Sequence, residues 1–144
     1  MRSTKKLKYM GKILALDVGA KRIGYAVSDE SRTMVFPRSF LTTRPEEKIF
    51  ENLRKIVREE GISQIVIGVP LGEDNEETKS SAKVRRFGDK LARELMLPIF
   101  YVDEFGSTNE ALSKIPFRKD RRERGNDDSI AAQVILQRYL DGRK

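Results

Sequence analysis

The stretch Ile13-Leu14-Ala15-Leu16-Asp17-Val18-Gly19 has the composition of a buried β-strand, a short apolar run that ends at a glycine. Asp17 is the exception within this run. An ionised carboxylate in apolar surroundings is costly unless it is paired or binds a metal ion. The stretch therefore predicts a core strand with little access to water, and a functional carboxylate at Asp17.

The pattern around this strand predicts an antiparallel sheet in the first part of the chain. Strands are expected at 12–18 and 23–28, joined by a turn at 19–22 that contains a glycine. A third strand is expected at 34–40. It is placed at an edge of the sheet, because Pro37 has no N–H to donate to a neighbouring strand.

Two amphipathic helices alternate with two further strands in the middle of the chain. The first helix is predicted to begin with a capping box of Thr43 and Glu46, to hold Pro45 in its first turn and to end at Gly61. The second is predicted to follow a polar loop at 72–75 and to end at Pro98, and the strands are expected at 65–69 and 99–102. The apolar faces comprise Ile49, Leu53, Ile56 and Val57 in the first helix and Val84, Phe87, Leu91 and Leu95 in the second.

The last part of the chain is expected to be helical. A short helix capped by Ser107 precedes a basic loop and a final helix from about 127 to 140. The resulting order is β-β-β-α-β-α-β-α-α, with antiparallel strands first and parallel crossovers later. This order predicts an α/β protein with a five-stranded mixed sheet flanked by α-helices.

Composition bounds the class of protein. The 144 residues are 38% hydrophobic and 35% charged, which predicts a single globular domain over 1–144 with a basic N-terminal arm at 1–11. The arm lacks the apolar segment of a secretory signal, and no apolar run is long enough to span a bilayer. The absence of cysteine excludes disulfides and agrees with a cytoplasmic protein. A formal net charge of +7 favours nucleic acid over a membrane as partner.

Two further acidic clusters lie at the edges of apolar segments. Asp103-Glu104 follows a predicted strand, and Asp127-Asp128 begins a predicted helix, so both are expected to converge near Asp17. With no histidine or cysteine in the chain, metal chemistry rests on these oxygen ligands, which suit Mg²⁺ or Mn²⁺. Paired ions of this kind serve displacement at phosphorus. Structural alternatives remain open: Asp127, Asp128 or Asn126 as a helix cap, and Asp103 in a surface ion pair.

Basic residues are concentrated in one stretch before the last helix. As a clamp on a phosphate backbone, this stretch would give affinity without sequence specificity; as a connector, it would simply be solvated. Basic residues of the second helix could extend such a surface. The predicted nucleic-acid contacts are Lys21 and Arg22 in the first turn and Arg118, Lys119, Arg121, Arg122 and Arg124 in the basic stretch.

Several motifs resemble the YqgF family, also called RuvX. The opening signature is Asp17-Val18-Gly19-Ala20-Lys21-Arg22-Ile23-Gly24-Tyr25-Ala26-Val27-Ser28-Asp29. The resemblance continues in the same order over nearly the whole chain, through Ile67-Gly68-Val69-Pro70-Leu71, Asp103-Glu104 with Ser107-Thr108-Asn109-Glu110-Ala111, Asp128-Ser129-Ile130-Ala131-Ala132 and Ile135-Leu136-Gln137-Arg138-Tyr139-Leu140.

The resemblance implies an RNase H-like fold, shared with the Holliday junction resolvase RuvC, and divalent-metal nuclease chemistry. It maps the family's acidic positions onto Asp17, Glu104 and Asp128, with Asp127 as the alternative for the last. Family members have been assigned two roles, 5′-end processing of pre-16S ribosomal RNA and resolution of Holliday junctions. Two positions depart from the family pattern: Phe105 where arginine is usual, and Gly72 where asparagine is common.

Two other classes of function stay open at this point. Phe105 is compatible with a nucleic-acid-binding module that no longer cleaves, such as a ribosome-assembly factor. Asp17-Val18-Gly19 also resembles the phosphate-binding turn of actin-like proteins and sugar kinases, although those proteins need two domains to enclose a nucleotide. A junction resolvase would be a homodimer with two active sites, whereas an RNA-processing nuclease could act as a monomer.

Overall fold

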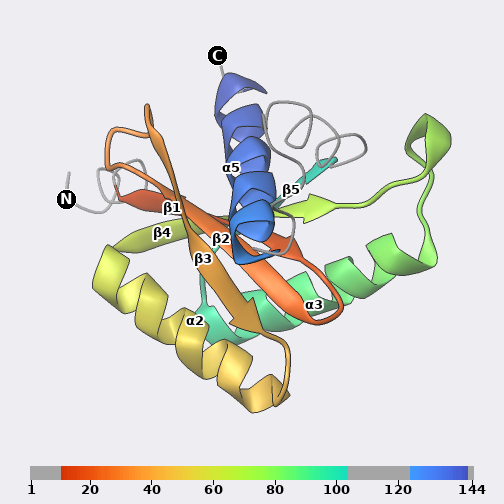
Figure 1. Cartoon of the computed structure of the whole chain (residues 1–144), viewed down its shortest axis with the longest axis horizontal. Coiled ribbons are helices and arrows are strands. Elements are labelled where there is room, and N and C mark those ends of the chain that lie inside the picture. Colours follow the sequence, from red (N-terminus) through yellow and green to blue (C-terminus); the bar gives the residue numbers. More distant parts are fainter. Residues whose placement is uncertain (1–10, 104–123, 143–144) are drawn as a thin grey trace.

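The computed structural model describes residues 11–103 and 124–142, apart from the side chains of residues 75 and 124–128. Its five-stranded sheet has the order β3-β2-β1-β4-β5, with β1 in the centre (Figure 1). β1 pairs antiparallel with β2, as β2 does with β3, whereas β4 is parallel to both β1 and β5. The strands are β1 (Lys12–Val18), β2 (Arg22–Ser28), β3 (Val35–Thr42), β4 (Ile62–Val69) and β5 (Ile99–Asp103).

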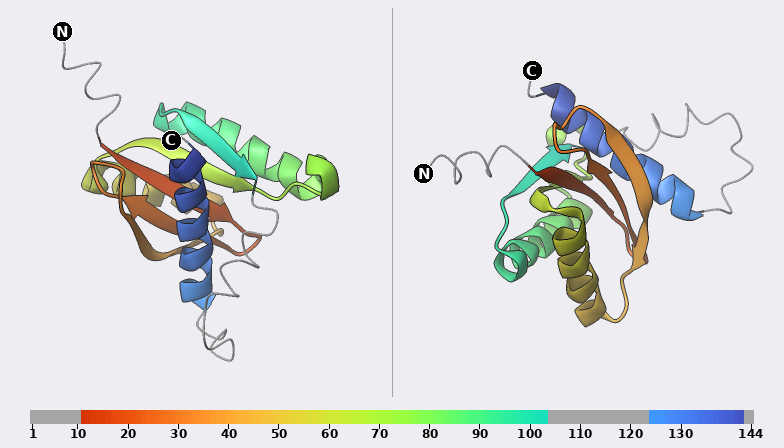
Figure 2. Two further views of the ribbon diagram at one scale, coloured as in Figure 1. Left: turned by 90° about the horizontal axis from the view of Figure 1, so that it is seen from above. Right: turned by 90° about the vertical axis from the view of Figure 1, so that its left-hand side faces the viewer.

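Helices cover both faces of this sheet. α2 (Glu46–Glu60) and α3 (Lys79–Leu95) lie side by side on one face, and α5 (Arg124–Gly142) crosses the other (Figure 2). A 3₁₀ turn, η1 (Glu73–Asn75), lies in the polar loop before α3. The predicted mixed sheet, the edge position of β3 and the parallel crossovers are all confirmed. No helix in the described part of the chain is long and apolar enough to cross a membrane.

The alternation of side chains along β1 divides the core in two. Leu14 and Leu16 are fully buried against α2 and α3, in a cluster that also contains Ile49, Phe50, Leu53, Val84 and Leu91. Ile13 and Ala15 are fully buried on the other face, in a smaller cluster with Val66, Ile135, Leu136 and Leu140. Since successive residues of a strand point to opposite faces, β1 is apolar on both.

The start of α2 differs from the predicted capping box. Pro45 is the N-cap residue and no side chain caps the helix, so Pro45 precedes the first turn. The Thr43 hydroxyl donates instead to the carbonyl of Ala20 at 2.8 Å, and the Thr43 N–H donates to that of Lys21 at 3.1 Å. The segment before α2 is thereby attached to the turn between β1 and β2. Gly61 ends the helix as predicted, with φ of 70°.

Other boundaries also shift. α3 begins with a capping box of Thr78 and Ser81, and it ends at Met96 with φ of 56°, before Pro98 is reached. α5 includes residues from Arg124 onward, so the predicted start near 127 was late. The first turn of α5 was missed because residues 124–126 carry no apolar side chain, so the sequence shows no apolar periodicity there. The arm at 1–10, the predicted short helix at Ser107 and most of the basic loop lie outside the described residues.

Candidate functional site

Asp17 lies next to the last residue of β1, directly opposite Gly24 of β2. Its side chain belongs to the α5 face, because the alternate residues Ile13 and Ala15 pack under α5. Asp17 is half-buried, whereas the preceding Leu16 is fully buried. The expectation that its neighbours leave little access to water was therefore wrong: the strand reaches the rim of the sheet, where a carboxylate keeps contact with solvent.

The turn beyond Asp17 is tightly closed. The N–H of Gly19 donates to the carbonyl of Arg22 at 2.8 Å. A Cβ atom at Gly19 would lie 2.9 Å from that same oxygen, closer than Cβ atoms approach in proteins, so the turn requires glycine. With the two bonds from Thr43, this closure fixes the backbone that carries Lys21 and Arg22.

The two predicted cations of this turn lie at the Asp17 end of the sheet. Lys21 is exposed and Arg22 is half-buried. The guanidinium carbon of Arg22 lies 4.6 Å from the centre of the Phe40 ring on β3, a cation–π geometry. The predicted acid and the predicted cations are thus brought together around one hairpin turn. Phe40 was not among the predicted site residues.

The carboxyl end of β5 lies at the same end of the sheet as the carboxyl end of β1. β1, β4 and β5 run parallel, and Asp103, the last residue of β5, pairs with Val69. Alternation assigns Asp103 to the α2–α3 face, because Tyr101 packs into that cluster whereas Val102 packs against the α5 cluster. The Arg138 side chain of α5 donates to the backbone carbonyl of Asp103 at 3.1 Å. The end of β5 is thereby held against α5.

The remaining predicted acids occupy different parts of the chain. Asp127 and Asp128 lie inside α5. Neither they nor Asn126 can be its N-cap, since the helix already includes Arg124, and that alternative was wrong. Glu104 lies outside the described residues, as do Arg118, Lys119, Arg121 and Arg122. The described part of Arg124 is its backbone, as the first residue of α5.

The donor chemistry at Asp17 fits a hard divalent cation. The chain offers no histidine or cysteine, so its acidic ligands are carboxylates, which Mg²⁺ and Mn²⁺ prefer. Among the side chains that the structure describes, no group of three acidic residues is gathered as a ligand set. Asp17 is the member of the predicted set whose side chain is described, and it is half-buried near the carboxyl end of the central strand.

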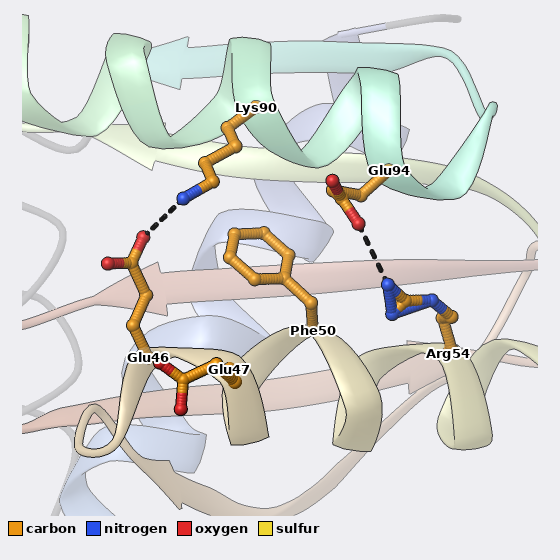
Figure 3. Close-up of a pocket in the computed structure, with 6 residues that line it drawn as sticks. All are labelled: Glu46, Glu47, Phe50, Arg54, Lys90 and Glu94. Carbon is orange, nitrogen blue, oxygen red and sulfur yellow. Dashed lines mark hydrogen bonds and ion pairs between the residues drawn. The ribbon is translucent and has the colours of Figure 1, made fainter.

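A shallow groove between α2 and α3 is of a different kind (Figure 3). It has a volume of about 270 Å³ and lies on the face opposite α5. Two ion pairs bridge its walls, Lys90 to Glu46 and Arg54 to Glu94, each at 2.8 Å. The Phe50 ring forms its floor. The charged residues of the two walls thus pair with one another, and the sheet separates the groove from Asp17.

Two basic residues of α3, Arg85 and Lys90, do not extend the Asp17 surface. α3 lies on the opposite face of the sheet, where Lys90 pairs with Glu46 and Arg85 makes two hydrogen bonds to Glu77, both at 3.0 Å. These bonds raise the pKa of the Arg85 guanidinium and lower that of the Glu77 carboxyl. The interpretation of α3 as an extension of the nucleic-acid surface is not supported.

The fold is similar to that of two solved Holliday junction resolvases. RuvC of Thermus thermophilus in complex with a Holliday junction substrate superposes with a TM-score of 0.58 at 13% identity, covering 92% of this chain and 95% of that one. The fowlpox virus Holliday junction resolvase superposes with a TM-score of 0.54 at 12% identity, covering 91% and 99%.

The family follows from the sequence. The model of the RuvX family, described as Holliday junction resolvase, matches residues 11–142, and this chain therefore belongs to the RuvX family. A relative from Maridesulfovibrio salexigens is 37% identical over 131 residues, which are 90% of this chain and 97% of that protein. One from Chloroflexus aurantiacus is 34% identical over 134 residues, or 92% and 88%. Both are named "Putative pre-16S rRNA nuclease". The resemblance to YqgF/RuvX is confirmed.

Proposed function

We propose that this protein is a divalent-metal-dependent nuclease that hydrolyses phosphodiester bonds in structured nucleic acid, with pre-16S rRNA as the favoured substrate. The observation that carries the proposal is a half-buried carboxylate, Asp17, at the end of the central strand of a RuvX-family chain with a RuvC-like fold. The names of the relatives support RNA as substrate.

Asp17, Glu104 and Asp128 are the proposed ligands, with Asp127 as the alternative to Asp128. Helical spacing favours Asp128, which precedes the fully buried Ala132 by four residues and Ile135 by seven, the positions of one helix face. For β5, alternation assigns Phe100 and Val102 to the α5 face, which is also the face of Asp17. Glu104 follows β5 directly in the sequence and lies outside the described residues, so it is proposed from the family motif.

The bound metal would be Mg²⁺ or Mn²⁺, and it would supply Lewis-acid stabilisation of charge at the scissile phosphate. The residues of this chain hold and orient the strand. Lys21 and Arg22 contact phosphates beside Asp17, and Arg118, Lys119, Arg121, Arg122 and Arg124 clamp the backbone further along. Contacts of this kind give affinity that falls steeply with salt and carries no sequence information.

The proposal extends to the whole protein as one RNase H-like nuclease domain over 1–144, with the arm at 1–11 as a further basic segment. We place it in the cytoplasm, where ribosomal RNA is processed. A single domain with one site would suffice for RNA processing as a monomer.

A cleavage assay tests the proposal. Purified protein is incubated with a structured RNA carrying the pre-16S 5′ end, with Mg²⁺, Mn²⁺ or EDTA. We expect cleavage with either metal, none with EDTA, and a loss of about 10²–10³-fold in rate for Asp17→Asn, the range for removing one charge-stabilising group. The matched control is Glu46→Gln, an acid of the α2–α3 groove. Equal cleavage by Asp17→Asn and wild type would refute the site.

A four-way DNA junction is the second candidate substrate. The family description and the RuvC-like fold favour it specifically. Resolution requires two cuts, so this function predicts a homodimer, which sedimentation of the protein with and without junction DNA would reveal. A monomer that cuts RNA and leaves junctions intact would exclude it. Binding of both substrates without cleavage of either would instead identify a non-catalytic module.

A further inference from the structure

The starting observation is the aromatic ring under Arg22. Phe40 is half-buried on β3, the edge strand of the sheet. Among the described residues, its strand neighbours Phe36 and Leu41 pack against the large α2–α3 core cluster, but Phe40 belongs to neither core cluster. The contact described for the Phe40 ring is with the Arg22 guanidinium.

A β-bulge determines which face Phe40 occupies. Tyr25 pairs with Ser39 and Ala26 pairs with Pro37, so Arg38 is the extra residue. Without the bulge, Phe36 and Phe40 would lie on one face, since they are four residues apart. With it, Phe36 stays on the α2–α3 face, whereas Phe40 moves to the α5 face.

Phe40 is thereby aligned with the candidate site. Gly24 is paired with Asp17 on one side and with Phe40 on the other, so the three positions form one row across β1, β2 and β3. Gly24 contributes no side chain between them. Arg22 lies two residues before Gly24 on the same face, and its guanidinium carbon is 4.6 Å from the Phe40 ring centre. Arg22 is therefore the diagonal cross-strand neighbour of Asp17 on this face.

We infer that Phe40 is a positioning residue, which holds the Arg22 guanidinium beside Asp17 so that it contacts a phosphate of the bound strand. A guanidinium that lies over an aromatic face directs its N–H groups outward in its own plane, the direction from which phosphate oxygens are bonded. Holding it in advance lowers the entropy lost when the strand binds. This inference rests on the proposed function and adds a residue to it.

The same strand provides a matched control pair. The guanidinium carbon of Arg38 lies 5.8 Å from the Phe36 ring centre, and Arg38 bonds Glu60 at 3.1 Å. Phe36 packs on the α2–α3 face, away from Asp17. A substitution of Phe36 thus also removes an aromatic ring from beside an arginine, but on the face of the sheet opposite Asp17.

The test compares Arg22→Ala, Phe40→Leu, Phe40→Tyr and the control Phe36→Leu, each first checked for folding by its melting temperature. RNA binding is measured at several salt concentrations with Ca²⁺ in place of the catalytic metal, and cleavage is measured with Mn²⁺. For Arg22→Ala we expect the slope of log K against log salt to fall by about 0.7–0.9, the value of one phosphate contact.

For Phe40→Leu we expect KM to rise about two- to fivefold with kcat nearly unchanged, in keeping with the strength of a partly exposed cation–π contact. Phe40→Tyr keeps the ring and should restore the wild-type KM, and Phe36→Leu should leave KM alone. An unchanged salt slope in Arg22→Ala, or a Phe40→Leu variant that differs from wild type in melting temperature alone, would overturn the inference. A wild type that binds RNA but cuts nothing would refute the nuclease and leave the binding comparison to decide the role of Phe40.

Discussion

The face of the sheet under α2 and α3 and the face under α5 are built from alternate residues of the same strands, yet they are covered differently. Two helices close the first face, and their charges pair with one another across the groove of Figure 3. Among the described elements, α5 alone crosses the second face, and Asp17, Arg22 and Phe40 lie toward one end of that face. The α2–α3 face thus holds the larger of the two described core clusters, whereas the α5 face carries the residues proposed to meet the substrate.

Removing one leucine from each face is the strongest way to test this division. Leu53→Ala and Leu136→Ala each remove a fully buried side chain, from the α2–α3 cluster and the α5 cluster respectively. We expect each to lower the free energy of unfolding by about 2–5 kcal/mol, measured by urea denaturation. Only Leu136→Ala should also reduce cleavage per folded molecule, because α5 carries the proposed ligand. Equal specific activities of the two variants would contradict the assignment of the active site to the α5 face.

The packing of α3 on β5 can be tested by adding a methyl group. A Cβ atom at Gly88 would overlap the hydroxyl of Tyr101, whose ring also lies 5.0 Å from the Arg85 guanidinium carbon. We expect Gly88→Ala to cost about 1–3 kcal/mol of stability, the usual effect of overpacking, with cleavage by the folded protein unchanged. Gly142→Ala is the control, since a Cβ there meets no atom within 4 Å. Calorimetric melting that ranks the two variants alike would contradict this packing.

Acidic pH should lower the stability of the fold by protonating Glu60 at the end of α2. Burial by itself raises the pKa of Glu60, but hydrogen bonds from Arg38 and Lys12 outweigh it and hold the pKa below its usual value of 4.5. A carboxyl with a depressed pKa in the folded state contributes stability above pH 4.5, and loses it as the pH falls through the folded pKa.

Because Glu60 remains partly exposed, this contribution should be about 1 kcal/mol or less. The measurement is the free energy of unfolding of wild type and Glu60→Gln between pH 7 and pH 3. The difference between them should shrink at the acid end of that range. A difference that stays constant with pH would show that the Glu60 ion pairs add nothing to stability.

The smallest effect is expected at the ion pairs of the groove. Arg54 and Glu94 are both more than 40% exposed, and surface pairs of this kind are worth about 0.2–1 kcal/mol. Arg54→Ala should therefore change stability only slightly and leave nucleic-acid affinity unchanged. RNA affinity of Arg54→Ala is measured beside that of Arg22→Ala. A drop for Arg54→Ala would mean that substrate binds the α2–α3 face, and it would contradict the assignment of substrate to the α5 face.

Sequence patterns predicted most of the strands because short apolar runs and their bounding glycines and prolines are local signals. They also singled out Asp17, whose charge conflicts with its neighbours, and Lys21 and Arg22 in the adjacent turn. The start of α2 was mispredicted because Thr43 has two possible partners, the helix and the turn at Ala20. That choice depends on a contact between segments 23 residues apart.

By itself, the sequence indicated that a carboxylate would lie near the end of a buried strand, that oxygen ligands would have to hold any metal, and that an anionic partner was favoured. These follow from residue types and local periodicity. Only the tertiary structure decided that Phe40 stands beside Arg22 and that the cations of α3 face away from Asp17. A bulge of one residue reverses the faces of a strand, and packing assigns a helix to one side of a sheet. Both are set by contacts between distant segments, which no local pattern encodes.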